Sequence, residues 1–405
     1  MKIGLLTYHS VYNFGASLQL YSTISYLEKK GHEPVVINWV PFDLEKRYDR
    51  SIPAEQAMAH RKFAGENFSL TELCRTAEDV AAVVDKNEFE LIIIGSDAVL
   101  QHSTLLSRLT MTSRGPVLRK KPGSDVIYPN PFWGSFIPKL KRKIPVVIMS
   151  ASSQNTKFRL VRGKQRREMA RALKRFSMVT VRDEWTRNMV SYLSYGRIKP
   201  VKTPDPVFAF NSNVGKVAGE KELKEKFKLP GNYLLVSFRT KRCISAEWMD
   251  KLKETAAAKN LECVALAMPD GIKFENNFNS SVNLPLSPED WYALIKYSSG
   301  YIGENMHPVV VAIHNGVPFF TFDSYGIVRF KFHVVNISSK IYDILADAGL
   351  LQNRTGILSR AYKMPDPSYV IDRITGFDYD ACKRFRSEKE EKYEEMMNRI
   401  LNLKE

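Results

Sequence analysis

Residues 301–320 have the sequence YIGENMHPVVVAIHNGVPFF, and their pattern sets the fold class. One apolar run ends in Gly303, a second follows Pro308, and Asn315-Gly316 separates the second from a third. Proline fits the first turn of a helix, where its missing N–H costs nothing, and glycine favours the end of a helix. The stretch therefore predicts a strand, a turn, a helix, a turn and a second strand.

His307 falls at the start of the helix in this unit. The N-terminus of a helix carries free N–H groups and the positive end of the dipole, so it attracts anions. A titratable imidazole at such a place indicates chemistry on a phosphorylated or carboxylated substrate. The alternative is that His307 only caps the helix.

Strands and helices alternate along the rest of the chain in the same way. In the first half, strands are expected at residues 2–7, 34–39, 91–94, 145–149 and 178–181, and helices at 15–30, 79–86 and 161–175. After a turn-rich linker at 205–219, helices are expected at 220–227, 246–259, 288–297 and 308–314, and strands at 233–238, 262–267, 300–302 and 319–321. A long charged helix is expected at 378–403.

This alternation predicts parallel sheets, hence an α/β protein with two doubly wound, Rossmann-like lobes that face a cleft. We expect an N-terminal domain at 1–210, a C-terminal domain at 220–370, and a C-terminal helix within 371–405 that packs back on the first domain. The arrangement is GT-B-like, as in two-lobed glycosyltransferases, but an architecture alone does not select a reaction. The predicted strands end in Gly, Ser, Asp or Arg, at the sheet edge where ligands bind.

The composition is that of a folded protein with two domains, since the chain has 405 residues of which 44% are hydrophobic. The apolar run at the N-terminus stops at Thr7, and no stretch approaches the ~20 apolar residues of a membrane span. We therefore expect no signal peptide and a cytoplasmic protein, which could still lie against the inner face of the membrane. Four cysteines without a CxxC pair favour a reducing compartment: Cys74, Cys243, Cys263 and Cys382.

The net charge of +16 is concentrated in one region. Residues 101–175 contain 18 Lys and Arg and two acids, so 18 − 2 = +16, and the remainder is nearly neutral. An anionic sugar, a lipid diphosphate or an anionic membrane surface fits such a region, and so does a solvated basic face. Nucleic acid is not favoured, because neither an RNP-like motif nor zinc-finger spacing is present.

Several short segments occur in an informative order. They are GLLTYH (4–9), YNFGASLQ (12–19), LEKKGHE (27–33), IGSD (94–97), VTVRD (179–183), DP (205–206), SFR (237–239) and residues 303–318. Together they resemble the polysaccharide pyruvyl transferase family, over roughly residues 1–325. The chain departs from the family at Ala98 and Leu100, which replace Gln and Trp, and at Asn305, where many members carry Arg.

The resemblance implies transfer of pyruvate from phosphoenolpyruvate to two hydroxyls of a sugar as a cyclic ketal, during assembly of a bacterial surface polysaccharide. Phosphoenolpyruvate would be a co-substrate, and we expect no cofactor and no metal, since no metal-ligand spacing such as HExxH is present. His307 would be the catalytic acid or base. The donor would be bound by Arg182, Arg239, Asn305 and Met306, and the acceptor by Asn13, Gly15, Ser96 and Asp97.

Each of these residues also has a structural alternative. Arg182 could form a surface ion pair with its acidic neighbours at 183–184, and Arg239 could belong to a solvated cluster with the basic residues at 241–242. Asn13, Ser96 and Asp97 could cap turns. His314, two turns beyond His307, is expected to interact with the C-terminal end of the helix dipole.

The acceptor is expected near residues 101–143, where Phe132, Trp133 and Phe136 stand among basic side chains and could stack on a sugar or a lipid-linked oligosaccharide. Two other functions stay open at this point. One is a glycosyltransferase that uses a nucleotide sugar on the same architecture. The other is a protein without catalytic activity that binds anions or a lipid surface through residues 101–175.

Overall fold

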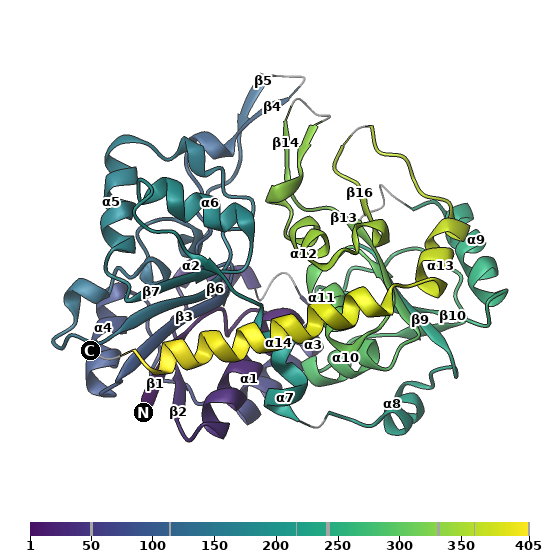
Figure 1. Cartoon of the computed structure of the whole chain (residues 1–405), viewed down its shortest axis with the longest axis horizontal. Coiled ribbons are helices and arrows are strands. Elements are labelled where there is room, and N and C mark those ends of the chain that lie inside the picture. The colour runs from purple at the N-terminus through teal and green to yellow at the C-terminus, as the bar shows by residue number, and fades with distance from the viewer. Residues whose placement is uncertain are drawn as a thin grey trace.

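The computed structural model describes residues 1–48, 52–112, 115–215, 217–239, 244–329, 333–359 and 361–403. Two parallel six-stranded sheets, each covered by helices, form two lobes side by side (Figure 1). The expected α/β fold with two doubly wound lobes is confirmed. All strand pairings within these two sheets are parallel, which agrees with strands that read as continuous apolar runs.

The sheet of the first lobe has the strand order β2-β1-β3-β6-β7-β8. Its strands are β1 (Lys2–Leu6), β2 (Glu33–Val36), β3 (Leu91–Asp97), β6 (Val146–Ala151), β7 (Met178–Val181) and β8 (Val201–Lys202). Its helices are α1 (Phe14–Lys29), α2 (Phe42–Tyr48), α3 (Ala54–Asn67), α4 (Ala77–Lys86), α5 (Gly163–Leu173) and α6 (Glu184–Leu193). A hairpin of β4 (Leu109–Thr112) and β5 (Gly115–Leu118) stands out from this lobe.

The sheet of the second lobe has the strand order β11-β10-β9-β12-β13-β16. Its strands are β9 (Tyr233–Ser237), β10 (Glu262–Leu266), β11 (Ser280–Val282), β12 (Gly300–Gly303), β13 (Phe319–Asp323) and β16 (Arg354–Gly356), with a hairpin of β14 (Ile327–Arg329) and β15 (His333–Val335). Its helices are α8 (Glu220–Phe227), α9 (Ala246–Ala257), α10 (Pro288–Lys296), α11 (Met306–Asn315), α12 (Lys340–Ala348) and α13 (Pro367–Thr375).

The sequence unit at 301–320 folds as expected into β12, α11 and β13. Asn305 is the N-cap residue of α11, and Gly316 ends the helix with a φ of 68°, a left-handed conformation that glycine adopts without a steric penalty. Val317 then donates its N–H to the carbonyl of Ala312, which satisfies an orphan group of the last turn. His307 therefore lies in the first turn of α11, as the spacing predicts.

The stretch 205–219, expected to be a linker, is instead largely packed structure. A 3-10 helix, η6 (Pro206–Ala209), runs directly into α7 (Phe210–Val214), and Phe208 and Phe210 are fully buried. The turn residues Asp205 and Pro206 begin this helix, since Asp205 caps it, and do not mark a solvated connection. The expectation of a linker was wrong because apolar side chains inside the stretch join the core.

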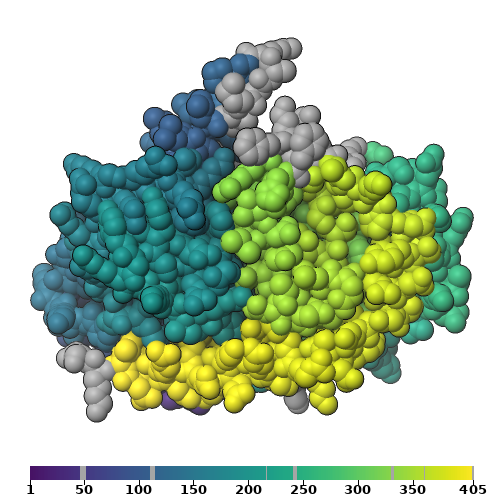
Figure 2. Space-filling view, turned by 45° about the horizontal axis from the view of Figure 1, so that its top comes forward, coloured from purple at the N-terminus to yellow at the C-terminus, as the bar shows by residue number. Residues whose placement is uncertain are grey.

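The C-terminal helix α14 (Tyr379–Leu401) crosses from the second lobe to the first, as expected (Figures 1 and 2). Its start contributes Phe385 to a cluster that includes α11, and its end contributes Tyr393 and Met397 to a cluster with Ile3 and Leu5 of β1. One helix thus completes cores in both lobes. Within the described part of the chain, no helix has both the length and the apolar character needed to cross a bilayer.

Candidate functional site

A cavity of about 800 Å³ lies between the lobes. Its walls come from the C-terminal ends of β3 and β9, from the starts of α1 and α11, and from nearby loops. In doubly wound α/β proteins this is the edge where ligands bind, and the volume suits a small-molecule substrate. Its polar lining includes Asn13, Asp97, Gln101, Gln154, Arg239, Asp270, Asn305, His307, Tyr325 and Lys340.

The imidazole of His307 reaches across the interface from α11 to the start of α1. A Cβ added to Gly15 would lie 2.1 Å from the Cγ and the Nδ1 of His307, so only a glycine leaves room for the ring at this position. Two helix N-termini, one from each lobe, thus meet at His307. The space beside Gly15, which the sequence assigns to the acceptor, is therefore filled by a side chain of the other lobe.

His307 is neutral at physiological pH. Burial, with a smaller contribution from Arg182, lowers its pKa to about 4, although the carboxylates of Asp205 and Asp97 act in the opposite direction. Its Nε2 lies 4.0 Å from Oδ2 of Asp205 and has no hydrogen-bond partner among the described residues. An unprotonated imidazole with one uncommitted nitrogen at a cavity is a candidate general base.

Arg182 follows β7 and is almost fully buried between two carboxylates. It donates to Oδ2 of Asp205 at 2.7 Å and to Oδ1 of Asp97 at 3.2 Å, and Gln19 also donates to Asp205. Burial would raise the pKa of Asp97, but the charge of Arg182 and smaller contributions from other groups around it, such as Lys340, together lower it. The guanidinium therefore holds the ends of β3, β7 and η6 together.

The alternative of a surface ion pair for Arg182 with its sequence neighbours is wrong. Asp183 instead caps α6 by accepting from the N–H of Thr186, and Glu184 pairs with Arg187. Arg182 itself does not line the large cavity, and it is linked to the lining by its hydrogen bond to Asp97.

Lys340 is a site residue that the sequence patterns did not single out. It is the first residue of α12, it lines the large cavity, and its ammonium faces the ring of Tyr325, 4.6 Å from the centroid. Burial lowers its pKa to about 8, with a further contribution from Arg182. Its ammonium makes no ion pair with the carboxylates in the described part of the chain. The only available signal was Ser339, a good N-cap residue before an apolar-periodic helix.

The other predicted donor residues surround the start of α11. Arg239 follows β9, has a side chain that is 59% exposed, and forms an ion pair with Asp270. Asn305 donates from Nδ2 to Sδ of Met268 at 3.3 Å and does not cap α11 through its side chain. The neighbours of Arg239 at 241–242 lie outside the described residues.

The predicted acceptor residues are not equally available to a ligand. Oδ1 of Asn13 accepts from the N–H groups of Gly15 and Ala16, so it caps α1, while Asn13 still lines the cavity. Asp97 lines the cavity and binds Arg182. Ser96 is buried, its Oγ has no partner among the described residues, and it does not line the cavity.

The aromatic residues at 132–136 cannot serve as a sugar platform. Phe132, Trp133 and Phe136 are at most 1% exposed and belong to the core of the first lobe. The expectation was wrong because their basic neighbours suggested a surface segment, whereas the rings themselves fill the space beside the sheet.

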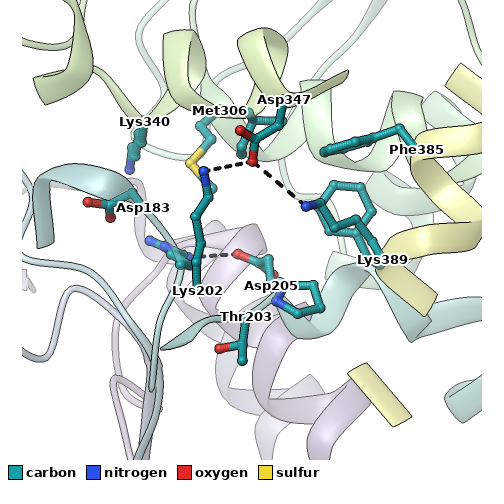
Figure 3. A pocket seen from close by; sticks show the side chains of 13 residues that line it. Asp183, Lys202, Thr203, Asp205, Met306, Lys340, Asp347, Phe385 and Lys389 are labelled. Atoms are coloured by element: carbon teal, nitrogen blue, oxygen red, sulfur yellow. Dashed lines mark hydrogen bonds and ion pairs between the residues drawn. The ribbon is translucent and has the colours of Figure 1, made fainter. Parts of the chain in front are cut away.

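A second, much smaller cavity, shown in Figure 3, adjoins the first, since Met306 and Lys340 line both. Its volume of about 20 Å³ has room for about one water molecule. Here Lys202 of the first lobe pairs with Asp343 at 2.8 Å and Asp347 at 2.6 Å of α12, and Lys389 of α14 lies 3.8 Å from Asp347. This network of charges fixes α12, and therefore Lys340, against the first lobe.

A family model described as polysaccharide pyruvyl transferase matches residues 13–324. No curated protein matches the chain in sequence.

Solved structures share the fold at low sequence identity. UDP-GlcNAc 2-epimerase from Neisseria meningitidis, bound to UDP-GlcNAc, matches with a TM-score of 0.57 and 9% identity, covering 100% of both chains. An alpha-glucosyltransferase in complex with UDP matches at 0.51 and 9%, covering 99% of this chain and 100% of the other. The spinosyn forosaminyltransferase SpnP matches at 0.50 and 14%, covering 98% and 95%. These likenesses establish the two-lobed GT-B-like fold.

Proposed function

Since the chain belongs to the polysaccharide pyruvyl transferase family, we propose that it transfers pyruvate from phosphoenolpyruvate to a sugar of a bacterial surface polysaccharide or its precursor. The product is a pyruvate ketal that bridges two hydroxyls of one sugar. The observation that carries the proposal is His307, a neutral imidazole that lines the cavity together with Lys340 and whose buried Nε2 has no hydrogen-bond partner among the described residues.

The reaction needs a base, an acid and a site for anions. Two C–O bonds form at C2 of the donor, and the bond from C2 to the phosphate oxygen breaks. One of the two hydroxyl protons ends on C3, which becomes a methyl group, and the other leaves with phosphate. A neutral His307 can take a proton from the attacking hydroxyl, and its burial keeps it unprotonated for that step.

The donor carries a phosphate and a carboxylate, and the second lobe offers cations for both. Lys340 makes no ion pair with a described carboxylate, and Arg239 lies at the same cavity with an exposed side chain. The start of α11, at Asn305 and Met306, lacks a side-chain cap, and the positive end of this helix dipole faces the cavity. We assign the donor to this side of the cavity.

Arg182 has a less direct part in this proposal than the sequence suggests. Two of its nitrogens already bind Asp205 and Asp97, so a donor anion would have to compete with two buried carboxylates. We therefore assign it a positioning role, in which it holds Asp97 and Asp205 near His307. The acceptor is assigned to the first-lobe side, at Asn13 and Asp97, with Gly15 as the close contact and Ser96 behind them.

The proposal is tested by release of inorganic phosphate from phosphoenolpyruvate in the presence of sugar diols, with mass-spectrometric detection of the ketal. A titration of thermal stability adds a test that needs no acceptor, because a ligand that binds the native state raises Tm. Phosphoenolpyruvate is expected to raise Tm, and UDP and GDP are not. Stabilisation by UDP or GDP alone would favour a glycosyltransferase and overturn the proposal. Phosphoenolpyruvate is made in the cytoplasm, so we assign the reaction to that compartment.

A further inference from the structure

The β4–β5 hairpin and the short 3-10 turn before it expose a group of large apolar side chains. Exposure is 66% at Leu105, 62% at Leu106, 49% at Leu109, 49% at Val117 and 51% at Leu118. Single exposed apolar residues are common on protein surfaces, but a cluster marks a surface that meets another apolar medium. The hairpin projects beyond the body of the first lobe (Figures 1 and 2).

The same segment carries only positive charge. No Asp or Glu occurs between Asp97 and Asp125, while Arg119, Lys120 and Lys121 follow β5 and are exposed. None of these three cations forms an ion pair in the described part of the chain. Arg108, which precedes β4, donates to the carbonyl of Arg119, which follows β5, at 2.8 Å. This hydrogen bond links the two ends of the hairpin.

The base of the hairpin is fixed at the rim of the large cavity. Gln101 before the hairpin and Pro122 after it both line that cavity. The returning chain is anchored because Ser124 donates to Asp43 through both its N–H, at 2.8 Å, and its hydroxyl, at 2.6 Å. A surface bound by the exposed side chains on either strand of the hairpin would therefore lie on the same side of the lobe as the cavity rim at Gln101 and Pro122.

We propose that residues 105–109 and 115–121 form a docking element for an anionic lipid bilayer. The leucine and valine side chains enter the headgroup region, and Arg119, Lys120 and Lys121 contact anionic headgroups. Leucines combined with cations, without acids, are the composition of interfacial membrane-binding segments. A protein partner would require complementary acidic and apolar features together, whereas an anionic bilayer supplies both without specific matching.

This inference is independent of the proposed reaction, because docking requires neither phosphoenolpyruvate nor a sugar. If both hold, the enzyme works at the membrane with its cavity beside the bilayer, where a lipid-linked acceptor would be presented. Vesicle binding and phosphate release are measured separately, so a negative result for membrane docking does not contradict the proposed reaction, and the reverse also holds.

The test is co-sedimentation of the full chain with phosphatidylcholine vesicles that contain about 30% phosphatidylglycerol, at two salt concentrations, with pure phosphatidylcholine as the neutral reference. We expect binding to the anionic vesicles that weakens as salt rises from about 0.1 M to about 0.5 M. Substitution of Arg119, Lys120 and Lys121 by Gln should weaken it on the order of a hundredfold. Leu105→Ser combined with Leu106→Ser should weaken it at least about tenfold, since the apolar contacts are lost.

The matched control removes three charges from the same basic region at α5, through Lys164→Gln, Arg167→Gln and Arg171→Gln. It should change binding less than about threefold, because α5 lies away from the hairpin. Equal losses in the hairpin and α5 variants would show diffuse attraction and overturn the proposal. So would absent vesicle binding, or a change of oligomeric state in light scattering caused by the leucine variants, which would identify the hairpin as a contact between copies of the chain.

Discussion

The imidazole of His307, in the second lobe, lies against the Cα of Gly15, in the first. This contact sets both the place of the ring and the distance between the two helix starts. It is specific to glycine, because any Cβ at position 15 would overlap the ring.

Gly15→Ala should therefore displace His307 and lower kcat at least about tenfold, since small misplacements of a catalytic group have large effects. The measurement is steady-state phosphate release together with Tm. Gly65→Ala is the matched control: Gly65 lies inside α3 and a Cβ there meets nothing within 4 Å. It should leave kcat unchanged and raise the free energy of unfolding by about 0.5–1 kcal/mol. Equal kcat for both variants would disprove the role of the contact.

His307→Gln should lower turnover about 10²- to 10⁴-fold while Tm stays within a few degrees, because a proton acceptor is lost and the volume is nearly kept. His314→Gln, on the other end of the same helix, should retain turnover. Phosphate release that survives in His307→Gln would remove His307 from the mechanism.

The charge of Lys340 should set the upper pH limit of activity. Its pKa is lowered to about 8, so the ammonium is lost as pH rises through that value, whereas His307 stays neutral down to about pH 4. We expect kcat/KM for phosphoenolpyruvate to fall above pH 8, and Lys340→Arg to move this limb upward because arginine keeps its charge. Lys340→Met should raise KM for phosphoenolpyruvate at every pH, since the positive charge is absent. An unchanged pH profile in Lys340→Arg would contradict an anion-binding role.

The pair of Arg182 and Asp205 should matter for stability far more than exposed ion pairs do. Their side chains are 2% and 1% exposed, and Asp205→Asn leaves the buried guanidinium with one remaining ion pair, to Asp97, in the described part of the chain. We expect a loss of about 3–5 kcal/mol in urea unfolding. Glu66→Gln, which removes an exposed pair with Lys62, should cost less than about 0.5 kcal/mol. If both variants lost a similar amount of unfolding free energy, the larger contribution of the buried pair would be disproved.

His314 should make the fold sensitive to acid. Burial lowers its pKa to about 3, and its Nε2 accepts from the N–H of Asn211 at 3.1 Å. The unfolded chain binds a proton near pH 6.5 and the folded one does not, so stability is lost as pH falls below that value. As the pH is lowered from 7 to 5, this histidine should reduce the free energy of unfolding by about 2 kcal/mol. The His314→Gln variant should lose about 2 kcal/mol less than the unchanged protein over the same range. Chemical unfolding of both proteins at the two pH values measures the difference.

The alternation of elements could be predicted from the sequence because the strands are buried on both faces. Leu91 to Ile94 is a continuous apolar run, and so is the start of β13, which makes both visible without tertiary information. The helix α3 was missed because its buried face includes Gln56 and His60, which are polar. Gln56 is buried because it exchanges hydrogen bonds with the backbone of Leu286 in the other lobe, a contact no local pattern encodes.

The candidate site was only partly predictable, for a similar reason. His307 is marked by its place in a helix start, which is local. The partners of Arg182 are 85 and 23 residues away in the sequence, so its neighbours at 183–184 were misleading. Lys340 becomes a site residue only because α12 is held against the first lobe, and an isolated lysine before an apolar helix carries no such information.

The crossing of α14 has a consequence for synthesis on the ribosome. Met397 and Tyr393 complete the core around Ile3 and Leu5, yet they are made after the whole second lobe. The first lobe therefore leaves the ribosome with an open apolar face that its own residues do not cover, and it must wait for the helix. Nascent chains that stop within the second lobe should bind chaperones that recognise apolar surface, although the residues of the first sheet have all been translated.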